Sequence, residues 1–197
     1  MVERNLIANY VHFHSSGAYG FGGKHLPRVL PHLLAFGPKS LIDYGAGRSP
    51  IAQRLGKKAG IDDVVSFDPA IPERSALPNR TFSVVVSFDV LEHIPEEEMH
   101  SVLSEMARLA PDALHVIDTR PAIATLSDGR NAHVSQHDED WWLERLRQYW
   151  PSAQAFPMNN GRVGIKTWSA SLPKWRHNLI VLREKVEMKL RKRFRMK

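Results

Sequence analysis

The feature that most constrains the fold is an alternation of short apolar segments with longer segments of helical periodicity. The short segments are rich in β-branched and apolar residues, as is typical of buried strands: residues 40–43, 64–68, 82–87 and 113–118. Segments with apolar residues at three- and four-residue steps lie around them: 25–36, 50–59, 95–109 and 138–150. This alternation predicts an α/β fold with a mostly parallel sheet and helices on both faces.

The chain closes with a hairpin pattern and a basic helix. Residues 153–156 and 163–168 flank Asn159-Asn160-Gly161, and Asn-Gly is a strong signal for a turn between antiparallel strands. Beyond this hairpin, apolar residues recur at helical steps in a strongly basic segment. The predicted organisation is one domain and one appended amphipathic helix: 1–173, with 1–37 as an N-terminal cap and helix, and 174–197.

Composition places the chain among ordinary globular proteins. Of its 197 residues, 43% are hydrophobic and 24% are charged, which excludes collagen-like and disordered classes, and the length suits one domain. The sequence has no cysteine, so disulfide frameworks, thiolate nucleophiles and cysteine zinc sites are excluded. Because it shows neither a run of about 18 apolar residues nor a secretory signal pattern, we expect a cytoplasmic protein.

The positive charge is confined to the tail. The formal net charge is +6, and Arg183–Lys197 contains eight basic and two acidic side chains, which leaves the preceding part of the chain neutral. The high pI therefore describes the tail and is no evidence for a nucleic-acid-binding body. We expect this tail to be suited to an anionic surface, either a membrane or a nucleic acid. No oligomeric state follows from the sequence.

An acid and two glycines stand where the first strand turns into the next helix. Asp43 is followed by Gly45 and Gly47, and glycines at such a turn let the backbone approach a ligand at the carboxyl edge of the sheet. A dinucleotide site requires a third glycine where Pro50 stands, and the glycine-lysine pair of a phosphate loop is missing. The pattern favours a cationic ligand without a pyrophosphate, with Asp43 facing an ammonium group. A purely structural turn is the alternative.

A second acid supports the ligand interpretation. Asp68 ends the second predicted strand about 20 residues after the glycine turn, where a carboxylate is placed for bidentate hydrogen bonds to ribose hydroxyls. A strand-end carboxylate that caps the next turn is the alternative, but it does not explain the two features together.

Three sequence motifs resemble the first, second and fourth motifs of class I S-adenosylmethionine-dependent methyltransferases: SLIDYGAGRSP, VVSFDP and FSVVVSFDVLEHIP. More narrowly, DTRPAIATLSDGRNAH followed by a Trp-Trp helix resembles small bacterial and phage methyltransferases whose substrate is unassigned. The resemblance implies a Rossmann-like fold with a C-terminal antiparallel hairpin and S-adenosylmethionine as cofactor. It also assigns cofactor contacts: Asp43, Gly45 and Gly47 to the methionine part, Asp68 to the ribose, and Ser87, Phe88 and Asp89 to positions beside the cofactor.

The sequence departs from the family pattern in two places. Ser49 stands at the third family glycine, and this small residue is a common substitution there. Only residues 69–81 lie between the second strand and the next, where the family usually fits a helix, a further strand and an adenine-contacting acid. Because Pro69, Pro72 and Pro78 disfavour a full helix in this segment, we expect a shortened excursion in which that strand is missing or rudimentary. Adenine contacts are therefore not assigned.

Candidate catalytic residues follow the third and fourth predicted strands. Glu92 and His93 have the character of a base with its orienting acid, although a plain helix start is the alternative. His133 lies in a polar loop after the fourth strand, where the family builds its acceptor pocket; a lid held by hydrogen bonds is the alternative. The same region supplies the expected substrate contacts: Arg120, Arg130, Asn131 and His137. The arginines would clamp an anionic acceptor group.

Two further interpretations concern a metal and the N-terminus. Acids and histidines of this region faintly resemble the metal ligands of small-RNA 3′-terminal 2′-O-methyltransferases, but the downstream spacing differs and we expect no metal: Asp89, Glu92, His93, His133 and His137. Aromatic and histidine residues near the N-terminus suggest a flap over the pocket or simple packing: Tyr10, His12, His14 and Tyr19.

The function predicted from these features is methyl transfer from S-adenosylmethionine to an oxygen or nitrogen nucleophile. Because the body of the chain is charge-balanced, we expect the acceptor to be a small molecule or a sugar-containing metabolite. Two alternatives remain open: an RNA or DNA methyltransferase that uses the basic tail, and a non-catalytic cofactor-binding protein that docks through it.

Overall fold

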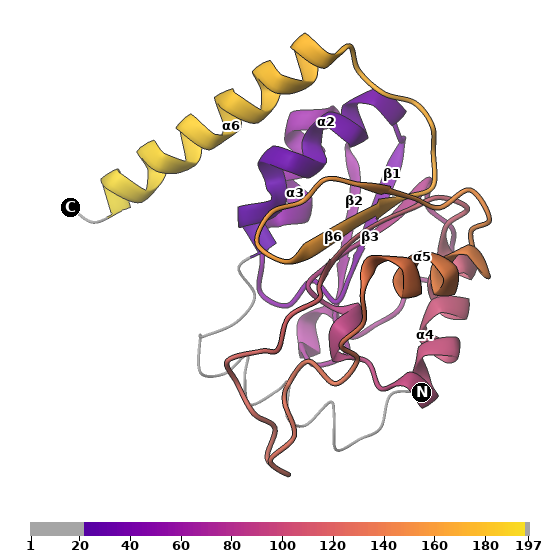
Figure 1. Cartoon of the computed structure of the whole chain (residues 1–197). Helices are drawn as coiled ribbons and strands as arrows, with labels where there is room; N and C mark the ends of the chain where they lie inside the picture. The colour runs from indigo at the N-terminus through magenta and orange to yellow at the C-terminus, as the bar shows by residue number, and fades with distance from the viewer. Residues whose placement is uncertain (1–21, 196–197) are drawn as a thin grey trace.

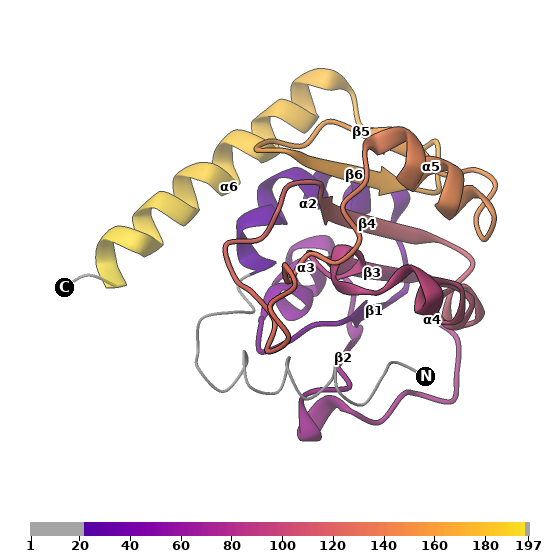
Figure 2. The same cartoon turned by 60° about the horizontal axis from the view of Figure 1, so that its bottom comes forward.

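A six-stranded sheet organises the part of the chain that this computed structural model describes, residues 22–195. Its strands are β1 (Ser40–Tyr44), β2 (Asp63–Phe67), β3 (Val84–Phe88), β4 (Ala113–Asp118), β5 (Gln154–Phe156) and β6 (Arg162–Lys166), in the order β2-β1-β3-β4-β6-β5. The first four are parallel, whereas β6 runs antiparallel to both β4 and β5. The predicted mostly parallel sheet with a C-terminal antiparallel pair is confirmed (Figures 1 and 2).

Helices cover both faces of this sheet. One face packs against α2 (Leu26–Phe36) and α3 (Ile51–Ala59), and the opposite face packs against α4 (Glu96–Leu109) and α5 (Glu139–Arg147). β3 and β4 are buried along their whole length, because helices lie on both sides of them. This burial explains why their sequences are continuous apolar runs rather than alternating ones.

Local sequence signals set the helix ends. Gly37 ends α2 in the left-handed conformation, with φ 67°, and its backbone N–H donates to the Leu33 carbonyl. The Asp138 side chain caps α5 by accepting from the Trp141 backbone N–H. α5 ends at Arg147, three residues before the predicted end.

The excursion after β2 is short, as predicted. Between Phe67 and Val84 the only regular element is a single 3₁₀ turn, η2 (Pro72–Arg74), so no strand pairs with the outer edge of β2. The sheet therefore ends at β2. The short 3₁₀ elements η1 (Gly22–His25) and η3 (Leu91–His93) lie before α2 and after β3.

The appended helix α6 (Lys174–Arg195) packs along α2, and its C-terminal part runs out past the body (Figure 1). The helical spacing of Leu179, Leu182, Val186 and Leu190 defines an apolar stripe on this helix, and its sequence predicts that the first half docks or associates and that the basic end projects. The structure shows that the stripe does not dock on the body: the docked side chains include Ile180 and Glu184, whereas Leu179 and Leu182 are exposed. Among the described helices, none has the length and apolarity needed to cross a bilayer.

The two adjacent tryptophans of α5 allow a test of the core. Trp142 is fully buried beneath the sheet, whereas Trp141 is half-buried and stacks on His137. We expect Trp142→Ala to lower the free energy of unfolding by about 3–5 kcal/mol, because it removes a large buried side chain and leaves a cavity. Urea unfolding measures this loss. Trp141→Ala is the matched control, and an equal loss in both variants would contradict the assignment.

Candidate active site at the carboxyl edge of the sheet

The glycine turn after β1 is tightly built. The backbone N–H groups of Gly45 and Ala46 both donate to the Phe67 carbonyl at 2.9 Å, which fixes the turn against the end of β2. Gly45 and Gly47 adopt left-handed conformations, with φ 77° and 51°. A Cβ at Gly45 would lie 2.7 Å from both Val90 methyl carbons, so only glycine allows the turn after β3 to pack this closely on the turn after β1.

Asp43 presents a buried carboxylate at this turn. Its side chain is almost inaccessible, and its Oδ2 has no hydrogen-bond partner among the described residues. Burial raises the pKa of Asp43 to about 7, the nearby Asp68 charge adds to this rise, and the charge of Arg74 opposes it. An unsatisfied buried carboxylate is costly. It is therefore a fitting partner for the ammonium group of a bound ligand.

Asp68 holds the glycine turn in place. Its Oδ2 accepts the Gly47 N–H at 2.7 Å and its Oδ1 accepts the Ala70 N–H at 2.9 Å. Each carboxylate oxygen has a second lone pair, so the expected bonds to ribose hydroxyls are compatible with these contacts. The proposed ribose role remains a prediction.

Arg74 is a contributor to this turn that the sequence did not reveal. It comes from η2 in the shortened excursion, and its Nη1 donates to the Gly47 carbonyl at 2.6 Å. The guanidinium thereby bonds the same turn as Asp68 and lies near enough to Asp43 to influence its charge. No motif marks it, because its role depends on how the excursion folds back.

The three residues expected beside the cofactor at the end of β3 differ in their placement. The Ser87 hydroxyl is buried and pairs with Nδ1 of His115 on the neighbouring strand β4 at 2.8 Å. Phe88 stacks on the His25 ring, with 6.1 Å between ring centroids. Asp89 stands in the left-handed region at φ 54°, an uncommon conformation for a non-glycine residue, and turns the chain into η3.

The Asp89 carboxylate is held by three cationic or potentially cationic groups. Lys24 Nζ lies 2.6 Å away, His25 Nε2 3.0 Å and Arg162 Nε 3.0 Å. Burial would raise the pKa of Asp89, but the hydrogen bond and charge of His25 and the charge of Lys24 outweigh it and lower the pKa. Asp89 thus ties the chain before α2 to the end of β3.

Arg162 extends this arrangement to the neighbouring strand. Its Nη2 lies 2.6 Å from the Asp118 carboxylate, which also binds Arg120. One guanidinium from β6 therefore links the carboxyl ends of β3 and β4. The sequence analysis missed Arg162; its position just after the Asn159-Asn160-Gly161 turn was the one available signal.

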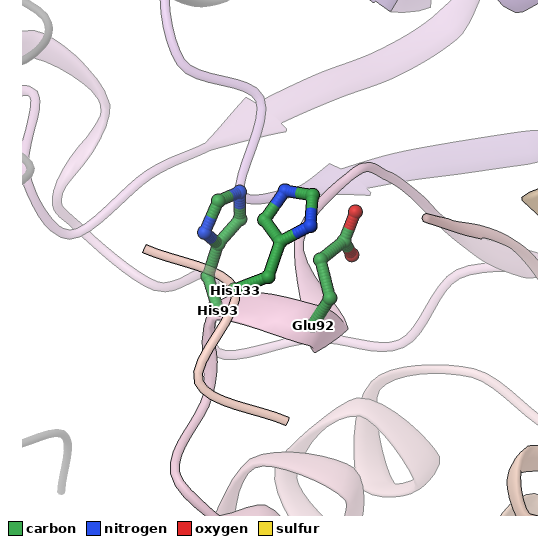
Figure 3. A group of neighbouring side chains, drawn as sticks. All are labelled: Glu92, His93 and His133. Atoms are coloured by element: carbon green, nitrogen blue, oxygen red, sulfur yellow. The ribbon is translucent and has the colours of Figure 1, made fainter. Parts of the chain in front are cut away.

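Glu92, His93 and His133 form the second half of the site (Figure 3). Each offers a carboxylate oxygen or ring nitrogen, and these atoms lie within 4.8 Å of one another. Glu92 and His93 come from η3 after β3, whereas His133 comes from the loop after β4. The two imidazole rings meet edge to face at 4.8 Å between centroids. The sequence predicted all three, and the fold brings them together.

Hydrogen bonds fix how these side chains are presented. His93 Nδ1 lies 2.8 Å from the Ala132 carbonyl and His133 Nδ1 lies 2.5 Å from the Arg120 carbonyl. Because a carbonyl only accepts, both Nδ1 atoms carry the proton and both Nε2 atoms are bare in the neutral rings. Burial lowers the pKa of His93 to about 4, so this ring is neutral at neutral pH.

Glu92 completes the cluster as a fully buried acid. Its Oε1 accepts the Asp118 backbone N–H at 2.9 Å, while its Oε2 has no hydrogen-bond partner among the described residues. Burial raises the pKa of Glu92 well above its usual value, and the charges of Asp89 and Asp118 add to this. The cluster therefore combines bare imidazole nitrogens with an unsatisfied carboxyl group, which suits proton transfer.

The residues expected to contact the substrate mostly support the loop. Asn131 bonds the Ala122 backbone twice and also accepts the His133 N–H, which orders the loop around His133. His137 stacks on Trp141 and bonds Glu96. Arg120 and Arg130 are exposed and bind Asp118 and Asp128, respectively. Hydrogen bonds thus hold the loop, as the lid alternative expected.

Two imidazoles and a carboxylate are also a donor set for a divalent cation. Of the five residues considered as metal ligands in the sequence, three gather here; Asp89 is held by its own cationic partners and His137 by Glu96 and Trp141. Glu92, His93 and His133 are the only such cluster found among residues 22–195. Any metal ion at this edge would be held by these three.

Comparisons with known proteins place this architecture. The sequence model of a family described as a methyltransferase domain matches residues 22–179. No curated protein matches the sequence. Solved structures resemble the fold: the methyltransferase domain of bacterial CtHen1 has a TM-score of 0.55 at 14% identity, covering 74% of this chain and 98% of that chain.

Two further structures are similar to the same extent. Magnesium protoporphyrin IX methyltransferase ChlM from Synechocystis PCC 6803, bound to S-adenosylhomocysteine, has a TM-score of 0.54 at 15% identity, covering 73% of this chain and 81% of its own. The DhpI complex with S-adenosylmethionine and HEP has a TM-score of 0.52 at 14% identity, covering 84% and 99%. With its sheet and its family match, the chain belongs to the methyltransferase-domain family, as a class I methyltransferase with S-adenosylmethionine as cofactor.

Proposed function

We propose that this protein transfers a methyl group to an oxygen or nitrogen nucleophile of a small molecule or a sugar-containing metabolite. The observation that carries the proposal is the cluster of Glu92, His93 and His133, which follows β3 and β4 at the same carboxyl edge of the sheet as the glycine turn after β1. The link between the two is the packing of Val90 against Gly45, since Val90 stands two residues before Glu92. The enzyme works in the cytoplasm, in line with its cysteine-free composition.

The chain's own residues hold the cofactor in an orientation suited to transfer. Asp43 meets the ammonium group, Gly45 and Gly47 let the backbone pass close to the ligand, and Asp68 receives the ribose. S-adenosylmethionine supplies a methyl group on a positively charged sulfur. The protein then needs to align the acceptor in line with that methyl group, which accounts for much of the rate gain.

The cluster removes the acceptor's proton. A neutral imidazole accepts a proton at its unprotonated Nε2, and the Nδ1 bonds to backbone carbonyls fix the tautomer that leaves Nε2 without a proton. His133 takes this role, because its ring lies next to the Glu92 carboxyl group in Figure 3. His93 and Glu92 contact the acceptor from the other strand end.

A small acceptor fits the charge distribution of the body. The basic excess of the sequence lies in its last fifteen residues, and the preceding chain is balanced. At the site itself, the exposed arginines Arg120 and Arg130 are each paired with an acid. These two pairings reduce the positive charge that Arg120 and Arg130 offer to a nucleic-acid backbone, which attracts clusters of lysine and arginine.

The cofactor role of Asp43 predicts a pH dependence. Its pKa of about 7 in the empty protein means that acid neutralises the carboxylate that the ammonium group needs. Affinity for S-adenosylmethionine should therefore fall by about 15-fold from pH 7 to about pH 5.5, where the ligand's ammonium group stays charged. Calorimetric titration measures this. The Asp43→Asn variant should bind S-adenosylmethionine weakly, with an affinity that hardly changes with pH. If the affinity of the wild type does not fall towards pH 5.5, Asp43 is not the partner of the ammonium group.

The catalytic role of His133 predicts a separation of turnover from binding. His133→Ala should lower kcat by roughly a hundredfold or more, the usual effect of removing a general base, while cofactor affinity stays within about twofold. Labelled methyl transfer into a metabolite extract provides the assay. The matched control is His100→Ala, a histidine on α4 that pairs with Tyr149, and it should retain full turnover.

Three outcomes would change this proposal. If His133→Ala loses turnover only in proportion to thermal stability, the histidine serves the loop's packing. If a chelator abolishes wild-type turnover and a divalent cation restores it, Glu92, His93 and His133 act as metal ligands instead of as a proton acceptor. If the labelled methyl group is found only in the nucleic-acid fraction of the extract, the acceptor is a nucleic acid and not a small molecule.

A further inference from the structure

An exposed apolar stripe runs along α6. Its side chains recur at steps of four, three, four and four residues, which places them on one side of a helix: Trp175 (69% exposed), Leu179 (57%), Leu182 (61%), Val186 (48%) and Leu190 (49%). Fifteen residues separate the ends of this stripe, a length of about 22 Å. Among the described residues, only Ile123 of the loop after β4 adds another large exposed hydrophobic side chain.

The opposite side of α6 is the one that docks on the body. Ile180 is partly buried against the core cluster to which α2 belongs, and the centroids of the His177 and His32 rings lie 5.3 Å apart. Glu184 is buried and lies 2.9 Å from Lys58 Nζ, and Glu187 lies 2.7 Å from the same ammonium group. These contacts fix the rotation of the helix and leave the apolar stripe facing outward.

This orientation of the helix places its acidic side chains towards the body and leaves basic side chains on the outward side. Both glutamates of α6 are turned towards Lys58, so the outward side carries no acid. At 100° per residue, exposed basic side chains flank the stripe on both sides: Arg176 and Arg183 on one side, Lys185 and Lys189 on the other. The outward surface is thus apolar along its centre and positive along both edges.

We propose that this outward face of α6 docks on an anionic lipid bilayer, with the helix lying in the plane of the membrane surface. An apolar stripe between two basic rows matches the boundary between acyl chains and negative headgroups. Lysine and arginine side chains reach up to the headgroups while the stripe enters beneath them, and a tryptophan such as Trp175 is favoured at that depth.

Two other occupants fit this surface less well. Stripe-to-stripe pairing of two copies would bring basic rows together, and the acids that could offset the repulsion are held by Lys58. A nucleic acid would use the basic side chains but leave the apolar stripe in water. Of these three occupants, only an anionic bilayer contacts both the apolar stripe and the basic side chains that flank it.

The docking surface is an addition to the methyltransferase domain. The family match ends at residue 179, and most of α6 lies beyond it. The helix packs along α2, and its C-terminal part runs out past the body (Figures 1 and 2). With the proposed cytoplasmic location, the negative cytoplasmic leaflet is within its reach. The inference concerns where the enzyme works and holds whichever acceptor it methylates.

Flotation of the full chain with vesicles tests this proposal. We expect binding to vesicles of phosphatidylcholine with phosphatidylglycerol and little binding to phosphatidylcholine alone. Leu179→Gln with Leu182→Gln removes the centre of the stripe without touching the docked side, and should reduce partitioning by about tenfold or more. Lys185→Gln with Lys189→Gln should reduce it by about fivefold for each charge removed. Raising the salt concentration should weaken wild-type binding.

A matched control comes from the same helix. Arg191 is exposed but bonds Glu187 on the side of the body, so Arg191→Gln should partition within about threefold of the wild type. Circular dichroism and S-adenosylmethionine titration verify that each variant is folded, independently of methyl transfer.

Three outcomes would overturn the proposal. The first is equal binding of the wild type and the Leu179→Gln, Leu182→Gln variant to anionic vesicles. The second is binding of double-stranded RNA or DNA that survives this variant and occurs without vesicle binding. The third is a dimer, detected by light scattering, that this variant abolishes in a protein that does not bind vesicles.

Discussion

The carboxyl edge of the sheet depends on one guanidinium. Arg162 projects from β6 and binds both Asp89 at the end of β3 and Asp118 at the end of β4. Around it, Lys24 and His25 join Asp89, and Arg120 joins Asp118, so segments far apart in the sequence converge on two carboxylates. Such partly buried pairs contribute mainly by fixing geometry, because removing one partner leaves the other charge without compensation. They hold the turns that carry Glu92 and the loop that carries His133.

Within this frame, two buried acids are left incompletely satisfied. Asp43 and Glu92 each keep one carboxylate oxygen without a partner among the described residues, on either side of the contact between Gly45 and Val90. Burial raises the pKa of both. Unpaired buried groups cost stability, and they cluster at functional sites because the missing partner arrives with a ligand. In the proposed function, Asp43 binds the ammonium group of the cofactor and Glu92 contacts the acceptor.

Contacts with the body of the protein decide which face of α6 is exposed. Its sequence shows an apolar stripe and many basic residues, and a stripe of this kind usually packs on the body. Lys58 changes that outcome by drawing Glu184 and Glu187 inward, so the stripe is turned to the outside. Two ion pairs with α3 therefore help to set which face of this helix is exposed.

Local sequence determined the elements and the cofactor turn. Period, turn residues and prolines predicted the order of strands and helices along the chain, a glycine turn after β1 and a shortened segment after β2, because these depend on backbone preferences and nearby residues. The cluster of Glu92, His93 and His133 was predicted by residue type. Its assembly, the roles of Arg74 and Arg162, the burial of the Ser87 hydroxyl and the outward turn of the α6 stripe were decided only by the tertiary structure. Each of these features depends on contacts between segments that are far apart in the sequence. Such contacts cannot be recognised from the local sequence around either residue.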